Sequence, residues 1–201
     1  MPFPAKVFIA YAAIMAVALS RLRAYHPFPS FGPANAVTTV RAVLAAIVCG
    51  CIGEAHTTEV AAGAVAAATT ATILDGVDGW LARRTRMASA FGARFDMEVD
   101  ALLILALSIL TWRHGKAGAW VLVSGLLRYA FTAAGWLAPW MTRPLTPTRR
   151  GRAICVVQIV ALLVAMLPAV QPPGSTIVAA IGVAALVYSF GVDTVWLWRH
   201  R

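Results

Sequence analysis

Apolar residues in this 201-residue chain gather in long runs that only short polar segments interrupt. Six runs are each close to the length of an α-helix that crosses the roughly 30 Å hydrocarbon core of a bilayer. They cover residues 36–53, 59–78, 97–112, 117–140, 153–170 and 175–198. The pattern predicts an all-α integral membrane protein built as a bundle of six transmembrane helices.

A shorter apolar stretch precedes these runs, from Val7 to Leu19, with Lys6 on one side and Arg21 and Arg23 on the other. Its length suits a signal-like segment, an interfacial helix or a seventh span. No convincing cleavage site of small residues follows it, which favours a retained helix. We therefore expect residues 1–30 to form an N-terminal apolar helix with a basic connection, and residues 31–201 to form the six-helix membrane domain.

Composition agrees with the hydropathy pattern. The chain is 60% hydrophobic and 12% charged, with a mean hydropathy of +0.76. These values lie far from those of a soluble domain. The six predicted spans leave no room for a separate soluble domain.

Basic residues give the chain a net charge of +9 and fall mostly on one side of the predicted bundle. The positive-inside rule makes that side cytoplasmic and predicts a multi-pass protein of the inner (cytoplasmic) membrane. No basic groove with interleaved aromatic residues is visible, so a nucleic-acid partner is not expected. The residues on this side are 13 of the 17 basic residues: Arg21, Arg23, Arg41, Arg83, Arg84, Arg86, Arg94, Arg143, Arg149, Arg150, Arg152, Arg199 and Arg201.

Four of the eight acidic residues lie within 26 positions, at the ends of two apolar runs: Asp75, Asp78, Asp96 and Asp100. The first two are three residues apart and the last two are four apart, so each pair can share one face of a helix. Carboxylates brought together in an apolar setting repel one another unless cations lie between them. Their hard oxygens suit Mg²⁺ or Mn²⁺. The spacing predicts a metal site at the cytoplasmic side, with the active site facing the cytoplasm.

The same segment reads D-x-x-D-G-x-x-A-R, then eight residues, then G-x-x-x-D-x-x-x-D. This matches every defined position of the signature of the CDP-alcohol phosphotransferase family, also called CDP-alcohol phosphatidyltransferases. The chain also resembles that family in its length and number of spans. Acidic residues that merely solvate helix ends would not need Gly79, Ala82 and Arg83 between them.

The resemblance implies phospholipid synthesis: a phosphatidyl group passes from CDP-diacylglycerol to an alcohol, and CMP is released. In the family the last aspartate is the general base, which puts Asp100 in that role. Asp75, Asp78 and Asp96 become metal ligands, with Asp100 shared, and two Mg²⁺ or Mn²⁺ ions are expected. Membrane lipids surround the protein, and a homodimer is an implication of the resemblance only.

Six residues are expected to bind the CDP group. Gly79, Ala82 and Gly92 lack bulk, so a nucleotide can approach the helix backbone there, and Arg83 offers a fork of donors to phosphate. Asn35 and Thr38 belong to the pattern Asn35-x-x-Thr38-x-x-Arg41, which is similar to the family segment that helps to hold CDP. By themselves these two residues fit a helix cap equally well.

The acceptor alcohol is less well specified. Positive charge favours glycerol 3-phosphate, and the candidate residues are Arg128, Arg149, Arg150 and Arg152. The segment Arg150-Gly151-Arg152 resembles a Gly-Lys segment of the family, with arginine in place of lysine. Serine, phosphatidylglycerol and choline stay open, and inositol phosphate ranks lower because the Arg-Pro-x-Arg pattern of its users is absent.

Two hypotheses from other functional classes compete with the hypothesis that the protein is an enzyme. A small cation transporter would carry acids near the middle of the membrane together with inverted repeats, whereas the acids here cluster at one face and no repeat is visible. A degenerate, non-catalytic scaffold is disfavoured because the signature retains all of its aspartates.

Overall fold

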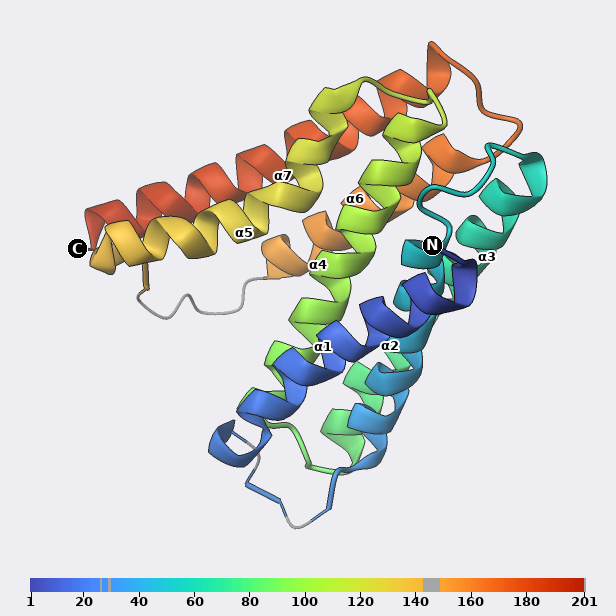
Figure 1. Ribbon diagram of the computed structural model, residues 1–201. Coiled ribbons are helices and arrows are strands. Elements are labelled where there is room, and N and C mark those ends of the chain that lie inside the picture. The colour runs from blue at the N-terminus through green and yellow to red at the C-terminus, as the bar shows by residue number, and fades with distance from the viewer. Residues whose placement is uncertain (26, 29, 143–148, 201) are drawn as a thin grey trace. The chain divides into compact units, whose positions relative to one another are not determined.

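The regular elements of the computed structural model are helices throughout the described residues, 1–25, 27–28, 30–142 and 149–200 (Figure 1). The prediction of an all-α fold is confirmed. Arg143, Arg201 and the side chains of Arg21, Arg23 and Arg149 lie outside the described part of the chain. The long helices are α1 (Phe3–Tyr25), α2 (Pro33–Gly50), α3 (Thr58–Arg84), α4 (Ala90–Arg113), α5 (Leu122–Leu137), α6 (Arg149–Met166) and α7 (Gly174–Arg199), with short 3-10 helices η1 (Ala119–Val121) and η2 (Pro139–Thr142).

Local sequence explains where the helices around the acidic segment begin and end. Thr57 caps α3, since its side chain accepts a hydrogen bond from the Val60 N–H at 3.3 Å. Ser89 caps α4 in the same way, accepting from the Gly92 N–H at 3.0 Å. Between them, Arg86 has a positive φ of 55°. The Arg86 and Met87 N–H groups donate to the last turn of α3, which closes that helix as a Schellman motif.

The start of α2 depends on a glycine. Gly32 has a φ of 79°, a conformation that other residues adopt at a cost, and Pro33 follows as the first helical residue. A Cβ on Gly32 would lie 2.9 Å from the Met87 side chain. The turn that enters α2 is thus packed directly against the residue that leaves α3.

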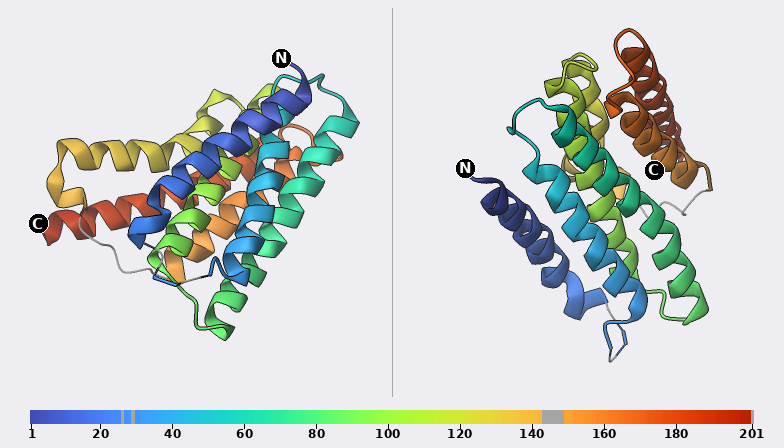
Figure 2. Two further views of the ribbon diagram at one scale, coloured as in Figure 1. Left: turned by 60° about the horizontal axis from the view of Figure 1, so that its bottom comes forward. Right: turned by 90° about the vertical axis from the view of Figure 1, so that its right-hand side faces the viewer.

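The described chain forms two compact units, Met1–Ala106 and Leu107–Arg201, and each is described by itself. In the first unit, α1 and α3 both pack against α2, as both views of Figure 2 show. The Lys6 Nζ donates to the Ile52 carbonyl oxygen at 2.9 Å and to the Glu54 carboxylate at 2.5 Å. These contacts hold the start of α1 at the turn between α2 and α3, so α1 runs antiparallel to α2.

Small residues line the contact between α2 and α3. Alanines at 64, 68 and 71 of α3 and at 42, 45 and 46 of α2 are fully buried. Their spacing on α3 follows one face, which continues to Asp75 and Asp78 at the next two positions. The Ala-rich helix α3 therefore packs closely against α2, and the same stripe places the aspartates on the side that faces α2.

In the second unit, α7 packs against α6 and α5. The buried Lys116 donates from Nζ to the Val170 carbonyl oxygen at 2.6 Å, and its own carbonyl accepts from the Ser175 hydroxyl at 2.7 Å. Farther along α7, Gly182 faces Gln158 of α6 so closely that a Cβ would lie 2.7 Å from the Gln158 Oε1 atom. Backbone contact at Gly182 thus sets the spacing of α6 and α7.

Five described segments are long and apolar enough to cross a membrane: Phe3–Ser20, Pro33–Gly50, Thr58–Arg84, Ala119–Leu137 and Gly174–Arg199. One of them belongs to α1, so the N-terminal helix is long enough for a span and not only for an interfacial helix. The predicted count of six is not confirmed, because α4 carries four charged residues in its first half and α6 begins with three arginines. The assignment of residues 1–30 and 31–201 to separate regions stays a prediction.

Candidate active site

The four aspartates lie inside α3 and α4, not at the helix ends that the apolar runs suggest. Asp78 is six residues before the end of α3, and Asp96 is six residues after the start of α4. At 1.5 Å per residue, each is about 9 Å from the end of its helix. The helices continue past the apolar runs because the caps at Arg86 and Ser89 lie beyond them.

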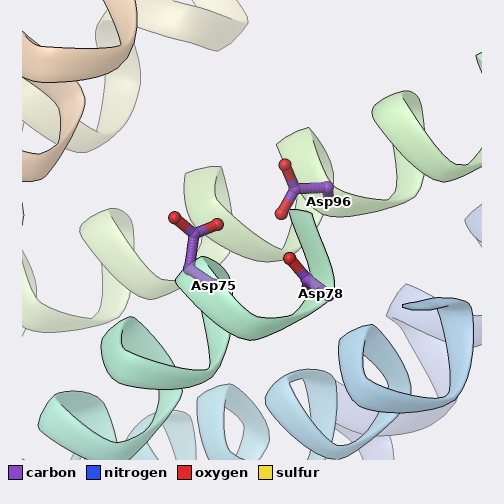
Figure 3. A group of neighbouring side chains, drawn as sticks. All are labelled: Asp75, Asp78 and Asp96. Carbon is purple, nitrogen blue, oxygen red and sulfur yellow. The ribbon is translucent and has the colours of Figure 1, made fainter. Parts of the chain in front are cut away.

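The two helices bring their carboxylates together. Oxygens of Asp75, Asp78 and Asp96 all lie within 4.8 Å of one another. Figure 3 shows Asp75 and Asp78 rising from α3 and Asp96 projecting from α4, with the three carboxylates turned toward a common space. The grouping that the residue spacing predicts is therefore present in the structure.

Arg41 of α2 lies at the centre of this cluster with a side chain that is 1% exposed. Its Nη1 donates to the Asp78 Oδ2 at 2.7 Å and also to Asp96. Its Nη2 donates to the Asp100 Oδ1 at 2.5 Å and forms an ion pair with the Asp75 Oδ1 at 2.9 Å. One guanidinium thus contacts all four carboxylates of the signature. Because four acidic groups face a single positive charge, the cluster carries an excess of negative charge.

The carboxylates differ in exposure. The side chain of Asp78 is 7% exposed and also accepts a hydrogen bond from the Thr38 hydroxyl at 2.9 Å. Asp75 and Asp96 are 30% and 38% exposed, and Asp100 is 20% exposed. Asp78 therefore forms the inner wall of the cluster, while Asp75 and Asp96 lie at its open side.

The donor set fits a hard divalent cation. Mg²⁺ and Mn²⁺ take carboxylate oxygens, and the three clustered aspartates can offer one each. The excess of negative charge over Arg41 favours a cation at the same place. Asp75, Asp78 and Asp96 could hold a metal ion.

Asn35 and Gly92 touch across α2 and α4. The Asn35 Nδ2 donates to the Phe31 carbonyl oxygen at 2.5 Å, and a Cβ on Gly92 would lie 3.0 Å from the Asn35 Oδ1. Both Asn35 and Thr38 are buried. The small size of Gly92 thus allows α4 to pack against α2. This packing role is separate from the predicted contact of Gly92 with the CDP group.

The remaining residues of the predicted CDP site are more accessible. Gly79 and Ala82 are half-buried, and Arg83 is exposed. A Cβ on Gly79 would meet only the Arg83 guanidinium, at 3.4 Å. The backbone at Gly79 is therefore covered by a flexible side chain that can move aside.

The four arginines predicted for the acceptor belong to the second unit. Arg128 lies half-buried on α5, Arg152 is exposed on α6, and Arg150 is paired with Asp193 of α7. The pair gives Asp193 the structural partner that its position near the end of the last span suggests. How Arg128, Arg149, Arg150 and Arg152 serve the acceptor stays a prediction.

Sequence reasoning missed the part that Arg41 plays. It was counted among the basic residues that mark the cytoplasmic side, but it lies in the middle of α2 with its charge buried among the aspartates. A buried, paired arginine is held by its acidic partners and does not report topology, so the place of Arg41 on the cytoplasmic side stays a prediction. The available signal was a lone arginine within an apolar run, because a cation there needs acidic partners.

The sequence model of the CDP-alcohol phosphatidyltransferase family matches residues 31–191, a range that contains α2 to α6, most of α7 and the complete cluster. No curated protein and no solved structure matches the chain. The family match covers well over half of the sequence, and the cluster is built from the residues of the family signature. The chain therefore belongs to the CDP-alcohol phosphatidyltransferase family and is a multi-pass membrane protein.

Proposed function

We propose that the chain transfers the phosphatidyl group of CDP-diacylglycerol to glycerol 3-phosphate and releases CMP. The observation that carries the proposal is the meeting of Asp75, Asp78, Asp96 and Asp100 around Arg41 in a chain of this family. A cluster with excess negative charge next to exposed arginines suits a nucleoside diphosphate bound together with cations.

Asp75, Asp78 and Asp96 are the proposed metal ligands, with Asp100 shared between two sites. Two Mg²⁺ or Mn²⁺ ions held there would offset negative charge on the diphosphate and on the departing CMP. Asp78 is suited to a fixed ligand, because Thr38 and Arg41 both restrain its carboxylate.

Asp100 is the proposed general base. It would accept the proton of the acceptor hydroxyl while the hydroxyl oxygen forms a bond to the β-phosphorus of the donor. The bond from that phosphorus to the oxygen of CMP breaks, and CMP leaves with the bonding electrons. The hydrogen bond from Arg41 to the Asp100 Oδ1 fixes the carboxylate, and the second oxygen is the one proposed to take the proton.

The CDP group is proposed to lie along α3, with its phosphates near Arg83 and its nucleoside against Gly79 and Ala82. The exposed Arg83 can move off Gly79 to reach a phosphate. Asn35 and Gly92 line the neighbouring contact of α2 with α4. The positive-inside rule is the basis for proposing that this site opens toward the cytoplasm and that the protein lies in the inner membrane.

Glycerol 3-phosphate is the proposed acceptor because it carries a phosphate that arginines can hold. Arg128, Arg149, Arg150 and Arg152 are the candidates. We expect Arg152→Gln to raise the KM for glycerol 3-phosphate severalfold and to leave the KM for CDP-diacylglycerol unchanged. Arg113→Gln, at the end of α4, is the matched control. Equal KM values in the two variants would remove Arg152 from the acceptor site.

The direct test uses the full chain purified in detergent with CDP-diacylglycerol and Mg²⁺ or Mn²⁺. Reactions would contain glycerol 3-phosphate, serine, phosphatidylglycerol, choline, inositol phosphate or no acceptor, with CMP release and the lipid product measured. We expect CMP release to need both the cation and an acceptor, and to be fastest with glycerol 3-phosphate. Folded protein that releases no CMP with any alcohol would refute the transferase proposal, and faster release with another alcohol would reassign the acceptor.

A further inference from the structure

Arg41 uses its whole guanidinium. This group has five N–H donors in a planar fork, and it makes five polar contacts in the cluster. Four are the contacts to the aspartates, and the fifth joins Nε to the Ala71 carbonyl oxygen at 3.2 Å. The backbone contact sets the plane of the fork relative to α3, so the direction of each carboxylate contact is set as well.

Arg41 contacts only part of each carboxylate group. Arg41 contacts a single oxygen of each carboxylate: Oδ1 of Asp75, Oδ2 of Asp78, Oδ1 of Asp96 and Oδ1 of Asp100. None of these contacts uses the second oxygen of the aspartate. A cation can therefore bind the second oxygens of Asp75, Asp78 and Asp96 while the guanidinium keeps the first.

Neither the buried Arg41 guanidinium nor the group of four carboxylates is stable without the other. A buried cation in a membrane helix is costly when it is unpaired, and four neighbouring carboxylates repel one another. Arg41 is almost completely buried, so its charge is offset by the aspartates and not by water. The cluster has a permanent counter-ion that belongs to the chain itself.

We propose that Arg41 is a positioning residue that holds the four carboxylates in the geometry that binds the divalent cation, and that it does so before the cation arrives. The inference rests on the proposed function, because it takes these aspartates as cation ligands. From α2, Arg41 assembles the ligand set of two other helices, α3 and α4, and remains in place when the cation binds.

A lysine at this position separates geometry from charge. Lysine keeps the positive charge but has three donors on one nitrogen, so it cannot reproduce five contacts made by three nitrogens. If Arg41 supplied charge alone, Arg41→Lys would behave as the wild type. If it positions the carboxylates, the lysine variant should lose cation affinity although the charge is conserved.

The experiment measures Mn²⁺ binding to the purified full chain without substrate, by loss of the EPR signal of free Mn²⁺. We expect Arg41→Lys to raise the Kd for Mn²⁺ by about tenfold to a hundredfold, as loss of a residue that orients metal ligands typically does. The matched control is Arg84→Lys on α3, because Arg84 is exposed and lies over Trp80 at 5.2 Å. The control should keep the wild-type Kd.

Thermal unfolding in EDTA and in saturating Mn²⁺ gives an independent readout. The lysine variant should unfold roughly 5 to 10 °C below the wild type in EDTA, and saturating Mn²⁺ should widen the difference, because the wild type binds the ion more tightly and gains more stability from it. In the CMP assay, its activity should recover as Mn²⁺ is raised. If the lysine variant does not fold, Thr38→Val provides the test, since it loosens Asp78 while Arg41 remains, and it should raise the Kd severalfold.

Wild-type values of both the Mn²⁺ Kd and the EDTA unfolding temperature in Arg41→Lys would overturn the proposal. A wild-type Kd in Thr38→Val, together with an unfolded lysine variant, would do the same. Wild-type protein that binds no Mn²⁺ would overturn it as well, because the carboxylates would then not be cation ligands. A wild type that binds Mn²⁺ but releases no CMP contradicts only the transferase proposal.

Discussion

The four signature aspartates are chemically equal in the sequence but not in the structure. Asp78 is 7% exposed and restrained by two donors, whereas Asp96 is 38% exposed at the open side. A change from aspartate to asparagine should therefore have a different effect at each position. At Asp78 it disturbs the packed wall of the cluster, and at Asp96 it changes mainly what the cluster can bind.

At Asp100, we expect Asp100→Asn to leave folding intact and to slow turnover by about a hundredfold or more. The asparagine oxygen can still accept the hydrogen bond that Arg41 makes at 2.5 Å, but the amide cannot take a proton from the acceptor. CMP release would measure the loss, and thermal unfolding would report the fold.

Glu98→Gln is the matched control, since it makes the same change of a carboxylate to an amide on α4 outside the signature. It should keep wild-type turnover. Near-normal activity of purified Asp100→Asn would exclude Asp100 as the base.

Residue spacing was sufficient to predict which acids lie together, because three- and four-residue intervals determine helix faces. It could not predict their common partner. Arg41 is remote in sequence from Asp96 and Asp100, and only the tertiary contact of α2 with α4 brings its guanidinium to their carboxylates. The packing role of Gly92 against Asn35 was hidden for the same reason.

At the scale of elements, the alanine stripe of α3 controls how near α2 can come. We expect Ala68→Leu to destabilise the protein by about 1 to 3 kcal/mol, since Ala68 is fully buried against α2 and a larger side chain must force the helices apart. The separation would also draw Arg41 away from the Ala71 carbonyl oxygen.

Ala66→Leu is the control, because Ala66 is exposed on the same helix. Thermal unfolding in one detergent compares the two variants. Equal unfolding temperatures would mean that close packing at Ala68 is not required.

The contact between α6 and α7 offers a second matched pair, made of two glycines on one helix. A Cβ at Gly182 would lie 2.7 Å from the Gln158 Oε1 and 2.8 Å from the Ala161 Cβ, whereas a Cβ at Gly191 would meet nothing within 4 Å. We expect Gly182→Ala to lower the unfolding temperature. Gly191→Ala should be neutral or raise it, because alanine favours helix by about 1 kcal/mol over glycine. The opposite order would contradict the described packing of α6 on α7.

At the scale of the whole molecule, the apolar runs predicted the helices well but misjudged where they end. The charged turns after Asp78 and before Asp96 are helical although they are not apolar, because capping and not hydropathy decides where a helix stops. The apolar stretch from Val7 to Leu19 is short, so its sequence favours a retained helix but does not distinguish an interfacial helix from a seventh span. In the structure, helix α1 has 23 residues, and Lys6 near its start forms an ion pair with Glu54.

Membrane orientation can be tested at the two ends of α3. The positive-inside rule predicts that Thr85 faces the cytoplasm and that Ala55 faces the opposite side. In a variant without Cys49, Cys51 and Cys155, a membrane-impermeant maleimide should label Ala55→Cys in intact cells. It should label Thr85→Cys only after permeabilisation. The reverse pattern would invert the proposed topology.

The position of Arg41 also has a consequence for biogenesis. Arg41 lies at the middle of the 18-residue helix α2, and chain synthesis delivers α2 before the aspartates of α3 and α4 exist. An unpaired arginine at the centre of a helix opposes insertion by about 2.5 to 3.5 kcal/mol. Stable insertion of α2 in the bilayer should therefore wait for the next two helices. The residues of the candidate active site would then also decide when the first half of the protein becomes a membrane domain.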